Sequence, residues 1–241
     1  MSAPHPRAWG LATSRLTAAE LERFGALLDA AERRRAEAHP PGPHRAAYVA
    51  AHGALRLLLS SMTGVDPRAW SFARGRHGKP CIDGSLQAGD VRFSLAHSDG
   101  FAAVAAAFGR DVGIDAEALD RAVDADGIAA RHFTRRERGG LVRLGAAERR
   151  RRFFRLWTVK EAVLKAAGTG LRTPLDAFDV RLRPLGIVPH DPALGSPEHW
   201  SVRTFHATRR HVVAFAYRDE RPDAGKIAVR LVRTNGAEMA C

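Results

Sequence analysis

The sequence has few cysteines. Only Cys81 and Cys241 occur among its 241 residues, far apart and outside any Cys-x-x-Cys pattern. Neither a disulfide framework nor a structural zinc site is therefore indicated. We expect Cys81 to be buried and Cys241 to lie free at the end of the chain.

Long apolar segments are absent as well. No run reaches the roughly eighteen apolar residues that a membrane-spanning helix needs, and no hydrophobic run follows a basic segment near Met1. Apolar residues nevertheless make up 45% of the chain, which is ample for a buried core in one large domain or two smaller ones. The sequence predicts a soluble cytoplasmic protein without a membrane partner.

Negative charge is in short supply. Lysine and arginine number 38 against 26 aspartates and glutamates, which leaves a net charge of +12. Arginine is concentrated in runs at residues 33–35, 135–138 and 149–152. The surplus predicts an anionic partner, and nucleic acid, an acidic protein or a polyphosphate ligand fits it equally well on charge alone. The other interpretation of any one run is a solvated helix face.

The first half of the chain combines helices with a hairpin. Thr17 and Glu20 form a capping-box pattern, which predicts a helix that continues to the proline-rich segment 40–43. A second helix is expected over residues 44–64. Short apolar runs then predict two strands, joined in a hairpin by the turn Ser98-Asp99-Gly100.

The second half repeats this order. A strand at residues 112–116 comes first, and the capping-box pattern of Thr134 and Glu137 then predicts helical structure as far as Gly168. Further strands are predicted at residues 178–182, 200–205, 211–217 and 227–232.

The repeated order of helices and strands indicates an α+β fold that arose by internal duplication. Residues 91–108 are loosely echoed by residues 202–217. We expect an N-terminal half at residues 1–110 and a C-terminal half at residues 111–241. A cleft between two such halves, near residues 109–113, is a natural place for a functional site.

Two acidic clusters carry the expected chemistry. On a strand, Asp115 and Glu117 would point the same way because side-chain direction repeats every two residues. On a helix, Lys165 lies one turn after Glu161, on the same face. Carboxylates in this number suit Mg²⁺ or Mn²⁺, which completes its coordination with water and a substrate phosphate. The arrangement is typical of phosphoryl transfer, with a solvated strand end and a surface ion pair as the purely structural alternatives.

Four sequence blocks strengthen this interpretation. They are, in order, Gly78-Lys79-Pro80, Phe93-Ser94-Leu95-Ala96-His97-Ser98, Val112-Gly113-Ile114-Asp115-Ala116-Glu117 and Trp157-Thr158-Val159-Lys160-Glu161-Ala162. Together they resemble the 4′-phosphopantetheinyl transferase superfamily, in its longer, monomeric type, which is typified by the enzyme that activates surfactin synthetase. The resemblance implies a pseudo-twofold pair of α+β halves with coenzyme A between them. It also implies transfer of the phosphopantetheine arm of coenzyme A to a serine of an apo acyl or peptidyl carrier protein, with release of adenosine 3′,5′-bisphosphate.

The resemblance extends to individual residues. The metal-binding acids of the family are matched by Asp115, Glu117 and Glu161. Its coenzyme A contacts are matched by Arg45, Lys79, His97, Lys160 and Lys165. Among these, Lys79 and His97 match contacts to the 3′-phosphate, next to Ala96, where many relatives have serine. Trp157 is expected in the core, as an aromatic residue at helical spacing usually is.

The resemblance also implies roles for the polar residues near the reacting groups. Glu161 is the expected base that takes the serine proton, either directly or through a bound water. Lys165 is expected to neutralise the leaving bisphosphate, and Lys160 to hold the pyrophosphate from another side. Arg33 and Arg35 are expected to reach phosphate, although Glu32 beside them stands where a basic residue is common.

Carrier proteins of this kind are acidic, so the arginine surplus has a partner other than nucleic acid. Three rival functions are a metal-dependent phosphodiesterase or nuclease, a basic nucleic-acid-binding protein, and a family member that binds carrier protein without catalysis. The carrier and its pathway stay open between fatty-acid, polyketide and nonribosomal-peptide biosynthesis. The tolerance for acylated coenzyme A and the choice between Mg²⁺ and Mn²⁺ are open too.

Overall fold

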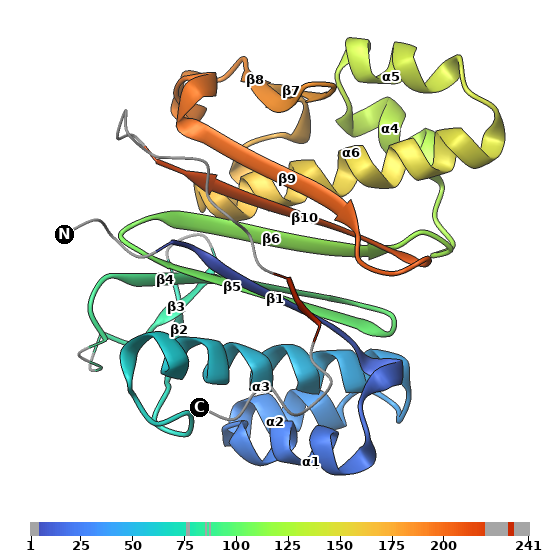
Figure 1. Ribbon diagram of the computed structural model, residues 1–241. Helices are drawn as coiled ribbons and strands as arrows, with labels where there is room; N and C mark the ends of the chain where they lie inside the picture. Colours follow the sequence, from blue (N-terminus) through green and yellow to red (C-terminus); the bar gives the residue numbers. More distant parts are fainter. Residues whose placement is uncertain (1–4, 76–77, 85, 87, 220–230, 234–241) are drawn as a thin grey trace.

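The two larger sheets in the described part of the chain lie between two long helices (Figure 1). The computed structural model describes residues 5–75, 78–84, 86, 88–219 and 231–233. One sheet is covered by α3 (Pro43–Thr63) and the other by α6 (Ala146–Ala167), so the strands occupy the middle of the molecule (Figure 1).

The two halves repeat one pattern of strand, long helix and hairpin. The first half contains β1 (Arg7–Ala12), α3, β4 (Val91–Ser98) and β5 (Phe101–Phe108). The second half contains β6 (Asp111–Ala118), α6, β9 (Trp200–His206) and β10 (His211–Arg218). In each half the first strand pairs antiparallel with the last, which gives the strand orders β1-β5-β4 and β6-β10-β9. The predicted α+β fold with repeated halves is therefore confirmed.

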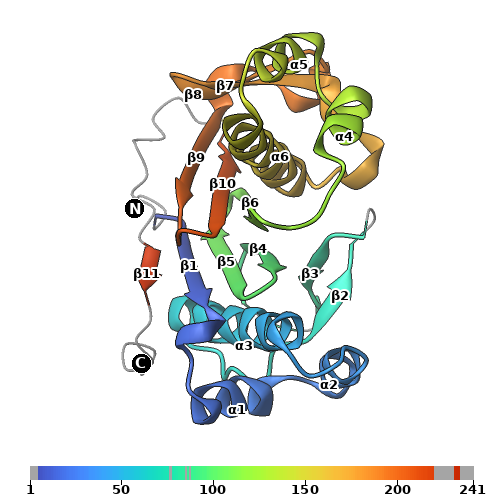
Figure 2. The same ribbon diagram turned by 90° about the vertical axis from the view of Figure 1, so that its right-hand side faces the viewer.

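Smaller elements surround this framework. They are α1 (Ala18–Leu27), α2 (Ala30–Glu37), β2 (Phe72–Arg74), β3 (Pro80–Ile82), α4 (Ala125–His132), α5 (Arg135–Val142), β7 (Phe178–Leu182), β8 (Leu185–Pro189) and β11 (Leu231–Arg233). Figure 2 shows α5, β7 and β8 beside α6, at the end of the molecule farthest from α1.

The helix expected over residues 44–64 is confirmed as α3, whereas the other two predicted helical regions are divided into shorter helices. The capping box of Thr17 is confirmed, but the helix that it begins is interrupted at Leu28, whose extended backbone separates α1 from α2. Asp29 then caps α2 and forms a capping box with Glu32, a signal that the sequence prediction overlooked. The helical region expected after Thr134 likewise divides into α5 and α6, and α4 before it was not predicted.

The predicted strands occur as far as the structure describes them, but β1, β2 and β3 were not predicted. The hairpin of β4 and β5 is confirmed, with Ser98 opposite Phe101 at its turn. The strand β8, which pairs with β7, was not predicted. Of the strand predicted at 227–232, residues 227–230 lie outside the described residues, and β11 pairs in parallel with β1.

Two serine hydroxyls join the sheets where β4 meets β6. Ser94 Oγ accepts a hydrogen bond from the backbone N–H of Ile114 at 3.1 Å, and Ser98 Oγ accepts one from Ala118 N–H at 3.0 Å. Ile114 and Phe215 lie in the apolar layer between the sheets and are fully buried. Because side chains alternate along a strand, the odd-numbered residues of β6 point the other way, toward α6.

Within the described ranges, no helix combines the length and apolar character needed to cross a membrane.

Cys81 is exposed, contrary to the expected burial. It lies on β3, where Ile82 packs against the core of the first half, and because side chains alternate along a strand Cys81 points to the opposite, solvent-facing side. Cys241 lies outside the described residues.

Candidate active site

Gly113 determines how closely β6 approaches α6. A Cβ atom built on this residue would lie 1.9 Å from the carbonyl oxygen of Ala162 and 2.5 Å from the amide nitrogen of Ala166. No side chain fits into that space, so only glycine allows the two backbones to come this close. The contact places the acidic side chains of β6 next to the polar face of α6.

Asp115 and Lys165 meet at this junction. Lys165 Nζ lies 2.7 Å from Asp115 Oδ1 and 3.1 Å from the carbonyl oxygen of Ile114. Asp115 is buried, and its second oxygen, Oδ2, has no hydrogen-bond partner in the described part of the chain. A buried carboxylate oxygen without a partner is costly, so this atom is open to a cation or a proton donor.

Glu117 has two partners that the sequence interpretation missed. Arg121 Nη1 lies 3.0 Å from both carboxylate oxygens of Glu117, and the indole Nε1 of Trp157 donates to Oε1 at 3.1 Å. Trp157 also packs against the core of the second half, as predicted. Its position one helical turn before Glu161 is the signal that would have indicated a place beside the acids.

The acids disfavour one another's charged forms. Burial raises the pKa of Glu161, the charge of Asp115 raises it further, and Lys165 opposes both effects. Burial and the charge of Asp115 also raise the pKa of Glu117, while Arg121 lowers it. Like charges held close together in a partly desolvated place account for both shifts.

This donor set fits a hard divalent cation. A cation among the acids would give the unpartnered oxygen of Asp115 a partner and would reduce the repulsion among the carboxylates. Carboxylates are also the ligands that Mg²⁺ prefers. Lys165 and Arg121 supply positive charge in the arrangement seen. Among the described residues, no three histidine, cysteine or acidic side chains are grouped closely enough to hold one ion as they stand. Binding would therefore require side-chain rotation.

A pocket of about 660 Å³ opens beside these groups. Asp115, Glu117 and Lys165 line it from the second half, and His97 of β4 lines it from the first. Further lining residues come from α3, namely His44, Tyr48 and His52. Three arginines also line the pocket, namely Arg35, Arg121, which is paired with Glu117, and Arg210, which is paired with Asp99 and Asp120. The pocket is therefore built by both halves and suits an anionic ligand.

Histidine and tyrosine rings pack around His97. Its ring meets His44 and Tyr48 edge-on, with 5.3 and 5.5 Å between ring centroids, and Tyr48 stacks on His52 at 4.2 Å. Burial, with the nearby charge of His44, lowers the pKa of His97 to about 4. The Nδ1 atom of His97 is buried and has no hydrogen-bond partner in the described ranges. A neutral imidazole with a free ring nitrogen can form a hydrogen bond with a ligand.

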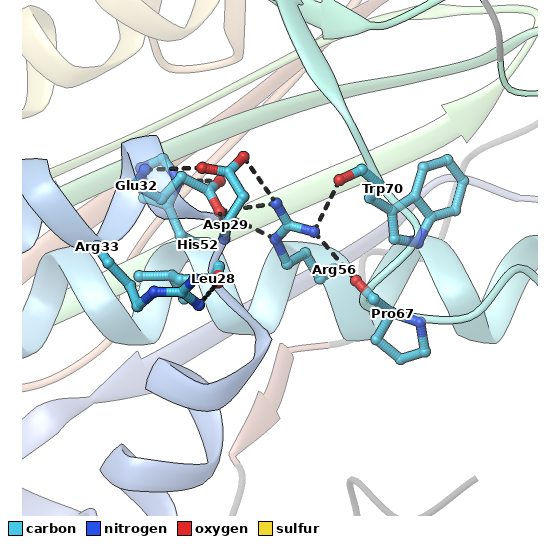
Figure 3. A network of polar contacts seen from close by, with 8 residues as sticks. All are labelled: Leu28, Asp29, Glu32, Arg33, His52, Arg56, Pro67 and Trp70. Atoms are coloured by element: carbon cyan, nitrogen blue, oxygen red, sulfur yellow. Dashed lines mark hydrogen bonds and ion pairs between the residues drawn. The ribbon is translucent and has the colours of Figure 1, made fainter.

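A buried network holds α2 against α3 at the edge of the pocket (Figure 3). The guanidinium of Arg56 lies 2.7 Å from Glu32 Oε2, and Nδ1 of His52 lies 2.9 Å from Glu32 Oε1. Burial raises the pKa of Glu32, but the hydrogen bonds of His52 and of the Asp29 backbone, with the charge of Arg56, lower it to about 2. Glu32 is therefore a structural anion at a position where a basic residue is common in the family that the sequence resembles.

The same helix places one of two expected arginines at the pocket. Arg35 lines the pocket, whereas Arg33 donates to the carbonyl oxygen of Leu28 (Figure 3). The two side chains leave α2 in different directions because helical residues two positions apart do not share a face. Only Arg35 is therefore placed to reach a ligand.

Lys160 does not join the pocket. Its side chain is fully buried, and Nζ lies 2.9 Å from Glu137 Oε1 and 2.8 Å from the carbonyl oxygen of Phe178. Glu161, the next residue, differs from it by about 100° in direction around the helix and is coupled electrostatically to Asp115 and Glu117. The pyrophosphate contact expected of Lys160 is not supported by this placement, since its ammonium group is enclosed in the core of the second half.

Arg45 and Lys79 also lie outside the pocket lining. Arg45 follows His44, which does line it. Lys79 Nζ donates to the carbonyl oxygen of Val112 at 3.2 Å, and burial lowers the pKa of this lysine. The expected residues that share the pocket are Asp115, Glu117, His97 and Lys165, with Glu161 coupled to them electrostatically.

Comparisons with known proteins agree with this geometry. A family model described as the 4′-phosphopantetheinyl transferase superfamily matches residues 111–216, a range that contains both acidic clusters. The 4′-phosphopantetheinyl transferase HetI of Nostoc sp. is 34% identical over 165 residues, which cover 68% of this chain and 69% of that protein. A 4′-phosphopantetheinyl transferase of Bacillus subtilis is 31% identical over 202 residues, or 83% of this chain and 86% of that protein. The 4′-phosphopantetheinyl transferase Sfp of Bacillus subtilis strain 168 is 33% identical over 134 residues, or 56% of this chain and 57% of that protein.

Proposed function

Since this chain belongs to the 4′-phosphopantetheinyl transferase superfamily and is a transferase, we propose that it moves the 4′-phosphopantetheine group of coenzyme A to a serine of an apo acyl or peptidyl carrier protein. The second product is adenosine 3′,5′-bisphosphate. The observation that supports this proposal most is the pocket in which Asp115, Glu117 and Lys165 of one half face His97 of the other. Such a pocket offers positive charge for phosphates and hard oxygen ligands for a metal.

In the proposed reaction the serine oxygen of the carrier attacks the phosphorus that bears the pantetheine group. The new P–O bond forms as the bond to the bridging pyrophosphate oxygen breaks, and that oxygen leaves with adenosine 3′,5′-bisphosphate. The serine proton passes to Glu161, directly or through a water. Burial raises the pKa of Glu161, which makes it a stronger base than an exposed carboxylate.

Lys165 is the proposed partner of the departing phosphate. Its ammonium group is held at the pocket wall by Asp115 Oδ1 at 2.7 Å and by the carbonyl oxygen of Ile114. Positioned positive charge stabilises negative charge that develops on a leaving oxygen. The lysine therefore needs little rearrangement to serve this role.

Asp115, Glu117 and Glu161 are the proposed ligands of Mg²⁺, with Mn²⁺ as the alternative. When bound, the ion would neutralise pyrophosphate oxygens and so favour attack at phosphorus. The acids would hold the ion at the β6–α6 junction, where Trp157 and Arg121 orient Glu117 through hydrogen bonds.

For coenzyme A, we assign the adenosine bisphosphate contacts to the N-terminal half (1–110) and the metal and catalytic residues to the C-terminal half (111–241). His97 is supported as a contact by its unpartnered Nδ1 atom in the pocket. For Arg45 and Lys79 the proposed contacts rest on the family resemblance alone. The proposed setting is a cytoplasmic monomer that serves an acidic carrier protein, which the net charge of +12 would attract.

Intact-mass analysis tests the proposal. Purified apo acyl and apo peptidyl carrier proteins are incubated separately with this protein, coenzyme A and Mg²⁺, with EDTA added to a parallel reaction. The expected result is a gain of one phosphopantetheine mass, which EDTA abolishes and excess Mg²⁺ restores. No gain on any carrier, with coenzyme A bound and the protein folded, would refute transfer, and a gain insensitive to EDTA would refute the metal requirement. Hydrolysis of coenzyme A without carrier modification would favour a phosphodiesterase.

A further inference from the structure

A second cavity, of about 940 Å³, lies among α5, the N-terminal part of α6 and β7. These elements gather at the end of the molecule opposite α1 (Figure 2). Among the residues that the structure describes, none that lines this cavity also lines the pocket at Asp115 and Lys165. The proposed transfer reaction therefore leaves this cavity without a role.

Eight arginines line the second cavity, which we call the arginine basin. The helix α5 and its C-terminal cap contribute Arg135, Arg136 and Arg143. The helix α6 contributes Arg151, Arg152 and Arg155, and β7 with the segment after it contributes Arg181 and Arg183. Two consecutive helices and a strand that follows α6 thus bring their arginines to one space.

Little negative charge offsets these arginines. None of the eight forms an ion pair with a carboxylate in the described parts of the chain, although neighbouring Arg149 pairs with Asp126 at 3.6 Å. The lining contains two acids, of which Glu137 is already paired with Lys160, and Glu148 is exposed. Within the described residues, the eight arginines of the basin therefore outnumber its one carboxylate outside an ion pair, that of Glu148.

The repulsion within the basin is visible at Arg155. Partial burial lowers the pKa of its guanidinium group, and the nearby charges of Arg183 and Arg152 lower it further. Like charges brought together at this cost are relieved by a bound anion. Arginine is suited to that task because its planar fork makes paired hydrogen bonds to phosphate or carboxylate oxygens.

We propose that the arginine basin binds a compact polyphosphate anion, in which several phosphate groups are linked close together. Eight guanidinium groups around about 940 Å³ match a ligand of high charge density, and the volume lies near the upper end for small-molecule sites. An acidic protein presents its carboxylates on a convex surface, from which few can enter a concave basin. A nucleic-acid duplex is too wide to enter it. The inference does not depend on the proposed transferase reaction.

Calorimetric titration with inorganic tripolyphosphate at physiological salt tests the inference. The full chain is compared with a basin variant, Arg151→Gln/Arg152→Gln/Arg181→Gln, whose three side chains are exposed, so folding should persist. The matched control, Arg131→Gln/Arg203→Gln/Arg209→Gln, removes the same charge from exposed sites outside both cavities. We expect the basin variant to bind at least about tenfold more weakly and the control less than about twofold, since charge-assisted hydrogen bonds are lost only in the first.

A lysine version of the basin variant separates geometry from charge. Arg151→Lys/Arg152→Lys/Arg181→Lys keeps the charge but loses the paired hydrogen bonds, so its affinity should fall between wild type and the glutamine variant. Equal weakening of basin and control variants, or no weakening in either, would overturn the proposal. Binding of polyglutamate or a single-stranded oligonucleotide through the same arginines, without tripolyphosphate binding, would overturn it in favour of a protein or nucleic-acid partner.

Discussion

Replacement of Gly113 by alanine tests whether the close approach of β6 and α6 builds the site. The new Cβ would lie 1.9 Å from the carbonyl oxygen of Ala162, against an ordinary contact of about 3.4 Å, so the backbones must separate by about 3.4 − 1.9 = 1.5 Å. Overpacking in a close-packed interior costs about 1–3 kcal/mol. For a chain of this size that corresponds to a loss of about 2–12 °C in Tm.

The same displacement should weaken catalysis. Lys165 on α6 and Asp115 on β6 are 2.7 Å apart, and a shift of about 1 Å can reduce the rate about a hundredfold. We therefore expect Gly113→Ala to lower Tm and to lower the rate of carrier modification by at least about tenfold, measured by thermal unfolding and intact mass. Gly139→Ala is the matched control, because nothing lies within 4 Å of a Cβ at that position of α5.

The nature of the clash gives this prediction a further check. The atoms in the way belong to the backbone of α6, so the second substitution Ala162→Gly should not rescue Gly113→Ala. If Gly113→Ala had the same Tm and the same rate of carrier modification as wild type, the close approach of β6 and α6 would not depend on glycine. Full rescue by Ala162→Gly would show that a side chain, and not the backbone, limits the distance.

Three further predictions concern single charges. Glu161→Gln should slow carrier modification by about 10²–10⁴-fold, while the Kd for coenzyme A, measured by calorimetry, should stay within about threefold of wild type. Unchanged turnover would show that Glu161 has no role in the reaction. Folding lowers the pKa of Glu32 from 4.5 to about 2, which contributes about 3 kcal/mol to the free energy of unfolding above pH 4.5. This contribution is lost as the pH falls toward 2, so the urea midpoints of wild type and Glu32→Gln should converge between these pH values. Parallel plots of midpoint against pH would contradict this prediction. Lys160→Ala leaves the buried carboxylate of Glu137 without its ion-pair partner and should lower the free energy of unfolding in urea by about 3–5 kcal/mol. The double variant Lys160→Met/Glu137→Gln should recover part of this loss. Unchanged stability together with lost affinity for coenzyme A would instead support Lys160 as a ligand contact.

Local patterns predicted the elements that depend on a few neighbouring residues. The capping boxes at Thr17 and Thr134 mark true helix starts, because a side chain three residues away satisfies the free backbone N–H groups. The turn at Asp99 lies between two strands, as the apolar runs predicted. The interruption after Leu27 was missed because the long apolar pattern hid the cap at Asp29.

The sequence by itself determined the α+β repeat, the family and the residue types of the chemistry, because strand and helix periods and motif blocks are properties of short segments. Only the tertiary structure decided which of these residues meet. The packing of α6 on β6 buries Lys160 beside Glu137 and turns Glu161 toward the acids, a difference of about 100° around one helix. The ring cluster at His97 and the arginine basin likewise unite side chains from separate elements. Such contacts follow from long-range packing, which local periodicity does not encode.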